Sequence, residues 1–212
     1  MKLKKVDAIQ LVENLKQAYP DATCSLDFKT PFQMVVAVML SAQCTDERVN
    51  KTTPSIFSKY NTPQDFVDID TNILENLIHP CGFYKNKAKN IKLCSQKLIS
   101  NFNGIVPKNM NDLLSLPGIG RKSANVILLE AFGIANGIAV DTHCKRIANR
   151  IGLSFESDPS KIEQDLLKIF PKNTLKDINH LFIWHGRNLC TARKPNCNIC
   201  PIKKYCNFWN NF

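Results

Sequence analysis

Residues 116–122, LPGIGRK, constrain the fold more than any other segment of the sequence. Glycine permits a positive φ and lets another backbone approach closely, so PGIG predicts a tight turn. On either side, residues 110–116 and 123–132 carry apolar side chains at helical spacing. We therefore predict a helix-hairpin-helix unit whose second helix begins near Arg121.

The predicted hairpin is also a candidate phosphate site. The N–H groups around Gly118 and Gly120, and those in the first turn of the following helix, have no acceptor within that helix. Together with the helix dipole they favour an anion, and Arg121 adds positive charge beside them. The alternative is a plain turn between two core helices. The full pattern, with apolar helices on both sides, favours binding of a DNA backbone.

The rest of the sequence predicts helices and almost no strands. Helical spacing of apolar residues recurs in residues 6–19, 46–59, 62–78, 87–102, 142–151 and 159–170. A break near Pro54 is an alternative for the second of these. Residues 31–43 fit a buried strand and a buried helix equally well. Hairpin turns between alternating apolar runs are nearly absent, so we predict an all-α fold.

The charge of the chain indicates an anionic partner. The net charge is +10, which favours nucleic acid first and an anionic membrane second, with a generally basic surface as the alternative. The longest apolar run, residues 34–40, is far shorter than the roughly 20 residues needed to cross a bilayer. The N-terminal segment is basic but amphipathic, with Asp7 and Glu13, and resembles neither a signal peptide nor an anchor. We expect a cytoplasmic protein.

Lys122 and Asp141 are the candidates for chemistry. Lys122 falls in the first turn of the predicted second helix, where the dipole opposes a cation by about 0.3–1 kcal/mol. A neutral amine is a nucleophile that can form a Schiff base at a sugar C1′, and a phosphate contact is an equal alternative. Asp141 directly precedes a predicted helix, so its simplest role is an N-cap. The alternative is a carboxylate that assists cleavage of a glycosidic bond, because the oxocarbenium-like transition state favours nearby negative charge.

Nine cysteines are present, and four of them lie close together near the C-terminus. Cys190, Cys197, Cys200 and Cys206 have the spacing C-x6-C-x2-C-x5-C, which is a strong metal signature. Structural zinc usually uses two short knuckles, and only one is present, so the wide gaps favour a [4Fe–4S] cluster over zinc. The five scattered cysteines indicate reduced, largely buried thiols in a reducing compartment.

Taken together, these residues resemble the endonuclease III family of DNA-repair glycosylases. The resemblance covers nearly the whole chain. It rests on SAQCTD (41–46), GFYKNKA (82–88), LPGIGRKSAN (116–125), AVDTH (139–143), HGR (185–187) and the four-cysteine ending. It implies two helical domains with a DNA-binding cleft between them. One is a helical barrel of residues 22–134 that carries the hairpin, and the other is an iron–sulfur domain of residues 1–21 plus 135–212.

The resemblance also implies a bifunctional enzyme acting on double-stranded DNA. An oxidised pyrimidine is flipped out of the duplex, its glycosidic bond is broken, and the abasic site is cleaved by β-elimination. Lys122 matches the Schiff-base nucleophile of the family, and Asp141 matches the carboxylate that assists it. The alternative from another class is a non-catalytic hairpin module with a structural metal site, which needs neither residue. We expect a monomer, associated with the nucleoid.

Three further positions follow from the resemblance. Gln43 matches the residue that fills the gap left by the flipped base. Phe83 stands where the family commonly has a leucine that wedges into the base stack, and Cys44 replaces a small residue. Adenine-mismatch relatives generally lack a lysine at position 122, so the lyase-competent branch is favoured. The candidate phosphate contacts are Lys85, Lys87, Lys89, Arg121, Lys145 and Arg193.

Overall fold

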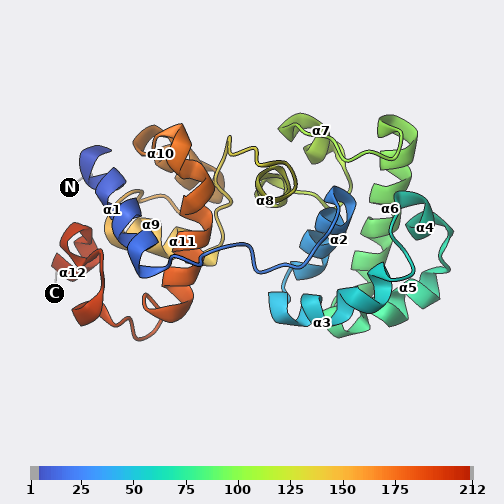
Figure 1. Cartoon of the computed structure of the whole chain (residues 1–212), viewed down its shortest axis with the longest axis horizontal. Coiled ribbons are helices and arrows are strands. Elements are labelled where there is room, and N and C mark those ends of the chain that lie inside the picture. Colours follow the sequence, from blue (N-terminus) through green and yellow to red (C-terminus); the bar gives the residue numbers. More distant parts are fainter. Residues whose placement is uncertain (1–4, 211–212) are drawn as a thin grey trace. The chain divides into compact units, whose positions relative to one another are not determined.

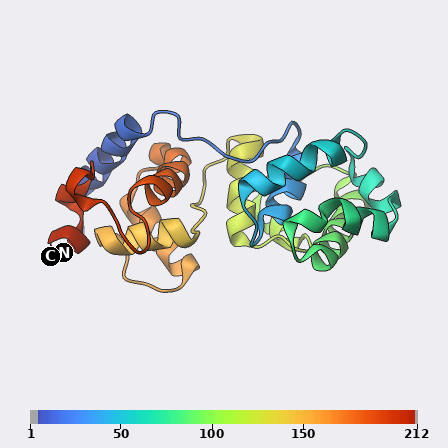
Figure 2. The same cartoon turned by 90° about the horizontal axis from the view of Figure 1, so that it is seen from below.

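The computed structural model describes residues 5–210. All of the regular secondary structure assigned in that range is helical (Figure 1). The predicted all-α fold is therefore confirmed. The chain divides into two compact units. The continuous unit is Ser25–Gly133. The split unit is made from the described residues before Ser25 and after Gly133, so helices from both ends of the chain form one body (Figure 2).

The continuous unit contains seven α-helices and one short 3-10 turn among its described residues. They are α2 (Pro31–Ser41), α3 (Asp46–Phe57), α4 (Pro63–Asp68), α5 (Thr71–Ile78), η1 (His79–Cys81), α6 (Tyr84–Phe102), α7 (Met110–Ser115) and α8 (Arg121–Phe132).

Helix α2 is the centre of this unit, and it resolves the ambiguity of residues 31–43 in favour of a helix. Thr30 caps it by accepting a hydrogen bond from the N–H of Gln33, and Pro31 occupies the first helical position, where its fixed φ is favourable. Residues 32–40 are all buried, and α2 packs against α3, α6 and α8. A helix covered on every side is apolar on every side, so it shows no clear helical period in the sequence.

The single helix predicted for residues 62–78 is wrong, because the chain forms α4 and α5 there. Asp70 lies between them, and its Oδ1 accepts from the N–H of Asn72 (2.8 Å) and the N–H of Ile73 (3.2 Å). These bonds satisfy the free donors of a new helix start. The break considered near Pro54 does not occur, since α3 continues through that residue.

The split unit contains α1 (Lys5–Ala18), α9 (Thr142–Ile151), α10 (Pro159–Ile169) and α11 (Leu175–Asn188), followed by short helical turns and α12 (Asn207–Asn210). Its core includes Leu11 and Leu15 from α1 and Phe182 from α11. Lys16 of α1 also pairs with Asp177 of α11 (2.9 Å). No helix was predicted over α11, although Leu175, Ile178 and Phe182 have helical spacing there.

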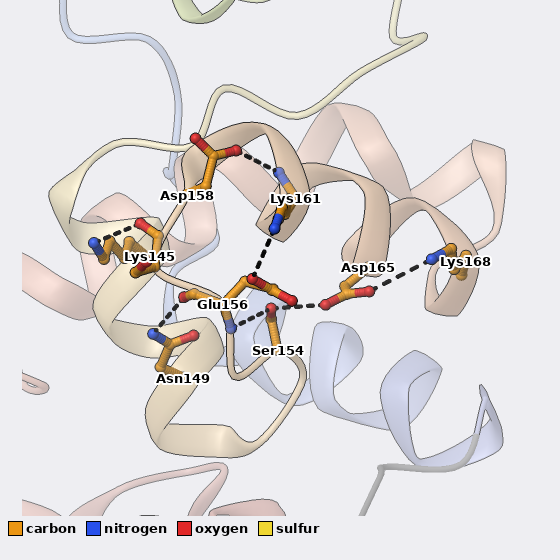
Figure 3. A network of polar contacts seen from close by, with 9 residues as sticks. Lys145, Asn149, Ser154, Glu156, Asp158, Lys161, Asp165 and Lys168 are labelled. Atoms are coloured by element: carbon orange, nitrogen blue, oxygen red, sulfur yellow. Dashed lines mark hydrogen bonds and ion pairs between the residues drawn. The ribbon is translucent and has the colours of Figure 1, made fainter.

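Polar contacts hold the connection between α9 and α10 (Figure 3). Asn149 donates to the carbonyl of Glu156 (3.1 Å), and the hydroxyl of Ser154 donates to Asp165 (2.8 Å). Lys145 donates to the carbonyl of Ser157 (2.7 Å). The ammonium of Lys145, a predicted phosphate contact, is therefore engaged in fixing this loop.

Candidate functional site

The hairpin predicted at residues 116–122 is present, and its two glycines differ in backbone conformation and in the space around them. Gly118 has φ +80°, and a Cβ there would lie 2.8 Å from Cε of Met39 and 3.1 Å from Cβ of Asn90. Gly120 has an ordinary extended backbone and precedes α8 without a side-chain cap. A Cβ at Gly120 would have no neighbour within 4 Å. The fold therefore requires glycine at position 118, whereas the surface at position 120 is open to another molecule.

Arg121 and Lys122 occupy the first turn of α8, and both side chains are exposed. The first helical bond to the turn runs from the N–H of Ala124 to the carbonyl of Gly120 (2.9 Å). The backbone N–H groups that precede Ala124 in the first turn of α8 have no acceptor within the helix. The positive end of the helix dipole adds to their positive field. The hairpin thus places the first backbone donors of α8 beside an accessible amine.

Asp141 caps α9, so the simplest role predicted for it is confirmed. Its Oδ1 accepts from the N–H of Cys144 (2.7 Å), and the residue is half-buried. Burial lowers the pKa of neighbouring His143, and the negative charge of Asp141 opposes that shift. Arg146 donates to Nδ1 of the same histidine (3.1 Å). The carboxylate is therefore fixed by the helix start and lies in a partly charged environment. Lys122 belongs to the continuous unit and Asp141 to the split unit.

Gln43 and Phe83 share an unusual backbone conformation. Their φ values are +53° and +48°, in the left-handed region, and neither is glycine. Gln43 follows the end of α2, and Phe83 immediately precedes α6. Both side chains are exposed, Phe83 to 64%. Gln43 therefore does not bridge core helices. Left-handed residues with a Cβ are disfavoured by about 1–2 kcal/mol, and such strain is often found at functional sites.

Lys87 is not on the surface, which corrects its prediction as a phosphate contact. It is 6% exposed, and its Nζ donates to the carbonyl oxygens of Leu40 (2.8 Å) and Cys81 (2.9 Å). Burial lowers the pKa of Lys87, while the thiols of Cys44 and Cys81 oppose the shift. A sequence shows the charge of a lysine but not the carbonyls that surround it. The remaining predicted contacts Lys85, Lys89 and Arg193 are exposed.

The four C-terminal cysteines line one pocket, together with residues such as Ile147, His185 and Trp209. The pKa of the Cys200 thiol is raised to about 11, mainly by burial and also by the charges of Cys190, Cys206 and Cys197, while a backbone hydrogen bond at Ile202 opposes the shift. Four sulfur donors this close are electrostatically unfavourable as thiolates without a cationic group between them. The donor set therefore fits an iron–sulfur group. Within residues 5–210, no three His, Cys, Asp or Glu side chains are arranged around a single ion position.

Two arginines of α9 hold the start of the cysteine loop, and neither was predicted. Arg146 donates to the carbonyls of Cys190 (3.1 Å) and Gly186 (3.0 Å). Arg150 donates to the carbonyls of Thr191 and Ala192 (both 2.8 Å) and approaches Sγ of Cys190 (3.3 Å). Their spacing of four residues, which places both on one face of a helix, was the available signal.

Comparison with known proteins defines the class of the chain. A family model described as HhH-GPD superfamily base excision DNA repair protein matches residues 36–172, and one described as the iron-sulfur binding domain of endonuclease III matches residues 190–206. The endonuclease III of Synechocystis sp. (strain ATCC 27184 / PCC 6803 / Kazusa) is 48% identical over 97% of this chain and 94% of that protein. The endonuclease III of Escherichia coli (strain K12) is 38% identical over 97% of each.

Solved structures agree with this class. A non-covalent endonuclease III–DNA complex and a trapped endonuclease III–DNA covalent intermediate each match with a TM-score of 0.92 and 40% identity, over 99% of this chain and 98% of theirs. The chain belongs to the endonuclease III family. It is a DNA glycosylase and abasic-site lyase with a [4Fe–4S] cluster. Among the described residues, no helix combines the length and apolar character required to cross a membrane.

Proposed function

We propose that this enzyme removes oxidised pyrimidines from duplex DNA, with Lys122 as the nucleophile and Asp141 as the assisting carboxylate. The observation that carries the proposal is the place of Lys122. Its amine is exposed in the first turn of α8, two residues after the open backbone of Gly120. A phosphate held by that turn would bring the adjoining sugar to the lysine.

The proposed chemistry uses Nζ of Lys122 as an amine nucleophile. Nζ of Lys122 attacks C1′ of the damaged nucleotide, the glycosidic C1′–N bond breaks, and the base leaves with a proton. Opening of the sugar ring gives a Schiff base between Nζ and C1′. Loss of a 2′ proton then expels the 3′ phosphate by β-elimination, and water releases the lysine. The Asp141 carboxylate stabilises the positive charge that develops on the sugar and takes part in proton transfer.

The flipped nucleotide leaves a gap in the duplex, and we assign Gln43 and Phe83 to it. Both are exposed on turns in the same unit, and both have a left-handed backbone. Gln43 would fill the gap, and Phe83 would stack against the neighbouring bases. Gly118 and Gly120 of the hairpin, with Arg121, Lys85 and Arg193, would bind the backbone on both sides of the lesion.

Cys190, Cys197, Cys200 and Cys206 are the proposed ligands of the [4Fe–4S] cluster. The bound cluster would supply the positive iron centres that four clustered thiolates require. We also propose that residues 22–134 and residues 1–21 plus 135–212 are separate domains, that the enzyme is a monomer, and that it works in the cytoplasm on nucleoid DNA.

The test is borohydride trapping on a duplex that contains one abasic site. Wild-type protein should give a covalent protein–DNA adduct, and Lys122→Ala should give none. Lys51→Ala is the matched control, because Lys51 is an exposed lysine of the same unit that pairs with Glu47. The control should retain the adduct. An adduct that persists in folded Lys122→Ala would show that another amine is the nucleophile.

A further inference from the structure

We propose that Lys87 is a positioning residue that holds the turns bearing Gln43 and Phe83 in a fixed relation to one another. The Gln43 turn is residues 42–45, between α2 and α3, and the Phe83 turn is residues 82–83, between η1 and α6. The inference rests on the proposed function of Gln43 and Phe83 in opening the duplex. It concerns a buried side chain that touches neither DNA nor the reacting atoms.

The side chain of Lys87 reaches the segment that leads into each turn. Its Nζ donates to the carbonyl of Leu40, three residues before Gln43, and to the carbonyl of Cys81, two residues before Phe83. The backbone N–H of Lys87 also donates to the carbonyl of Phe83 (3.1 Å). One residue at the start of α6 is thus bonded to the backbone beside each proposed DNA-probing residue.

The buried charge of Lys87 makes its hydrogen bonds to the two carbonyls necessary to stabilise the ammonium. Lys87 is 6% exposed as a residue, so its ammonium must be satisfied by its neighbours, since burial of an unpaired charge is strongly unfavourable. The carbonyl of Leu40 lies in the last turn of α2, where helix carbonyls lack partners and the dipole is negative. Lys87 therefore satisfies this helix end and is itself stabilised by it.

The backbone strain explains why such a tie is needed. Gln43 and Phe83 are both left-handed, and a strained residue persists only where the surrounding structure fixes it. Without the bonds from Lys87, each turn is free to relax toward negative φ, which would redirect the exposed side chain. The two side chains would then no longer enter the duplex together.

Helix α6 offers a matched control. Lys92 lies five residues further along, and its Nζ donates to the carbonyls of Val67 (2.8 Å) and Ile69, at the junction of α4 and α5. Lys92→Met removes the same kind of tie from the same helix, but away from Gln43 and Phe83. Lys87→Met and Lys92→Met are therefore compared with the wild type, each after measurement of its thermal unfolding midpoint.

The ratio of two reaction rates distinguishes a positioning role of Lys87 from a general effect on stability. Excision of an oxidised pyrimidine requires a stacked and paired base to be extruded, whereas β-elimination at a preformed abasic site requires only a sugar that has no base pairing or stacking of its own to be reached. In single turnovers, Lys87→Met should lower excision at least tenfold and β-elimination less than threefold. Lys92→Met should leave the ratio of the two rates unchanged at a similar unfolding midpoint. Equal ratios in the wild type and Lys87→Met would overturn the proposal, as would equal changes in both variants.

A fluorescent base gives a direct readout. With 2-aminopurine placed opposite an uncleavable abasic analogue, insertion of Gln43 and Phe83 should raise the fluorescence by unstacking the probe. Lys87→Met should lose at least half of that rise at saturating protein, and an undiminished rise would contradict the inference. Gln43→Ala and Phe83→Ala test the underlying assignment. If neither changes the signal, the proposed roles of these two residues fail; if they do and Lys87→Met does not, only the positioning role fails.

If Lys87→Met does not fold, Lys87→Arg tests the positioning role of Lys87 in its place. The guanidinium keeps the buried charge, but it is larger than an ammonium and its donors form a rigid planar fork, so it does not reproduce the position of Nζ between the carbonyls of Leu40 and Cys81. The ratio of excision to β-elimination should fall at least threefold in Lys87→Arg. An unchanged ratio would overturn the proposal.

Discussion

At the scale of single residues, the two hairpin glycines are expected to respond differently to the same change. Gly118→Ala places a Cβ against Met39 and Asn90 at a positive φ, so the free energy of unfolding should fall by about 1–3 kcal/mol. Gly120→Ala meets nothing within the chain, and its unfolding should stay within about 1 kcal/mol of the wild type. Urea denaturation measures both.

The same Gly120→Ala change should weaken DNA binding at least tenfold, because the added methyl group would occupy the space proposed for a phosphate. Binding to a short duplex with an abasic analogue measures this. Unchanged affinity in the well-folded variant would remove Gly120 from the binding surface.

Asp141 allows its two roles to be separated by substitution. Asparagine is as good an N-cap as aspartate, so Asp141→Asn should fold normally. The loss of the carboxylate should nevertheless slow base excision by about 10²- to 10⁴-fold. Asp141→Ala should show the same loss of rate and, in addition, lower the free energy of unfolding by about 0.5–2 kcal/mol. A fully active Asp141→Asn would leave the cap as the only role of this residue.

The residue scale also shows what the sequence predicts well. A turn with two glycines and a capping aspartate before a helix are local features, and both were found where the sequence put them. Lys87 was predicted wrongly because its environment is assembled from Leu40 and Cys81. Whether a lysine is solvated or bonded to carbonyls is a property of tertiary packing, which the local sequence does not contain.

At the scale of elements, α9 links two parts of the split unit. Asp141 caps its first turn, while Arg146 and Arg150 bind the start of the cysteine loop. Ten residues of α-helix span about 15 Å. The orientation of the proposed catalytic carboxylate and the anchoring of the cysteine loop therefore depend on the same helix, α9.

Removal of Arg150 should loosen the cysteine loop. Arg150→Met loses three donated contacts to residues 190–192, and the loop should open more often. The visible absorbance of the cluster should then decay at least threefold faster in the presence of an iron chelator. Lys168→Met is the control, since Lys168 of α10 contacts Asp165 at the surface (Figure 3). Equal decay rates for Arg150→Met and the wild type would show that the loop does not need this arginine.

Helix boundaries illustrate which elements the sequence defines. The range predicted for α9, residues 142–151, is confirmed, because an aspartate cap and a C-terminal glycine mark its ends. The gap between α4 and α5 was missed, since Asp70 lies within continuous helical spacing and its capping bonds are not visible in that pattern. Helix α11 was not predicted, although Leu175, Ile178 and Phe182 have helical spacing in the sequence.

At the scale of the whole molecule, the net charge of +10 should make DNA binding strongly dependent on salt. Each phosphate neutralised contributes about −0.9 to the slope of log K against log salt concentration. Arg193→Ala should therefore reduce the magnitude of the slope by about 0.9, and so should Lys85→Ala. Lys51→Ala should leave it unchanged. Titrations at several salt concentrations measure these slopes, and a flat dependence would contradict backbone binding by these residues.

The split unit has a consequence for how the protein is made. On the ribosome, α1 emerges first, with an apolar face of Ala8, Leu11, Val12 and Leu15 that is fully covered in the finished fold. Its partner α11 begins at Leu175, and at about 5–20 residues per second its synthesis lags by roughly 8–30 s. During that interval the whole of Ser25–Gly133 is completed. The nascent chain thus carries the complete continuous unit while the apolar face of α1 is still uncovered. We expect chaperones to bind α1 during translation.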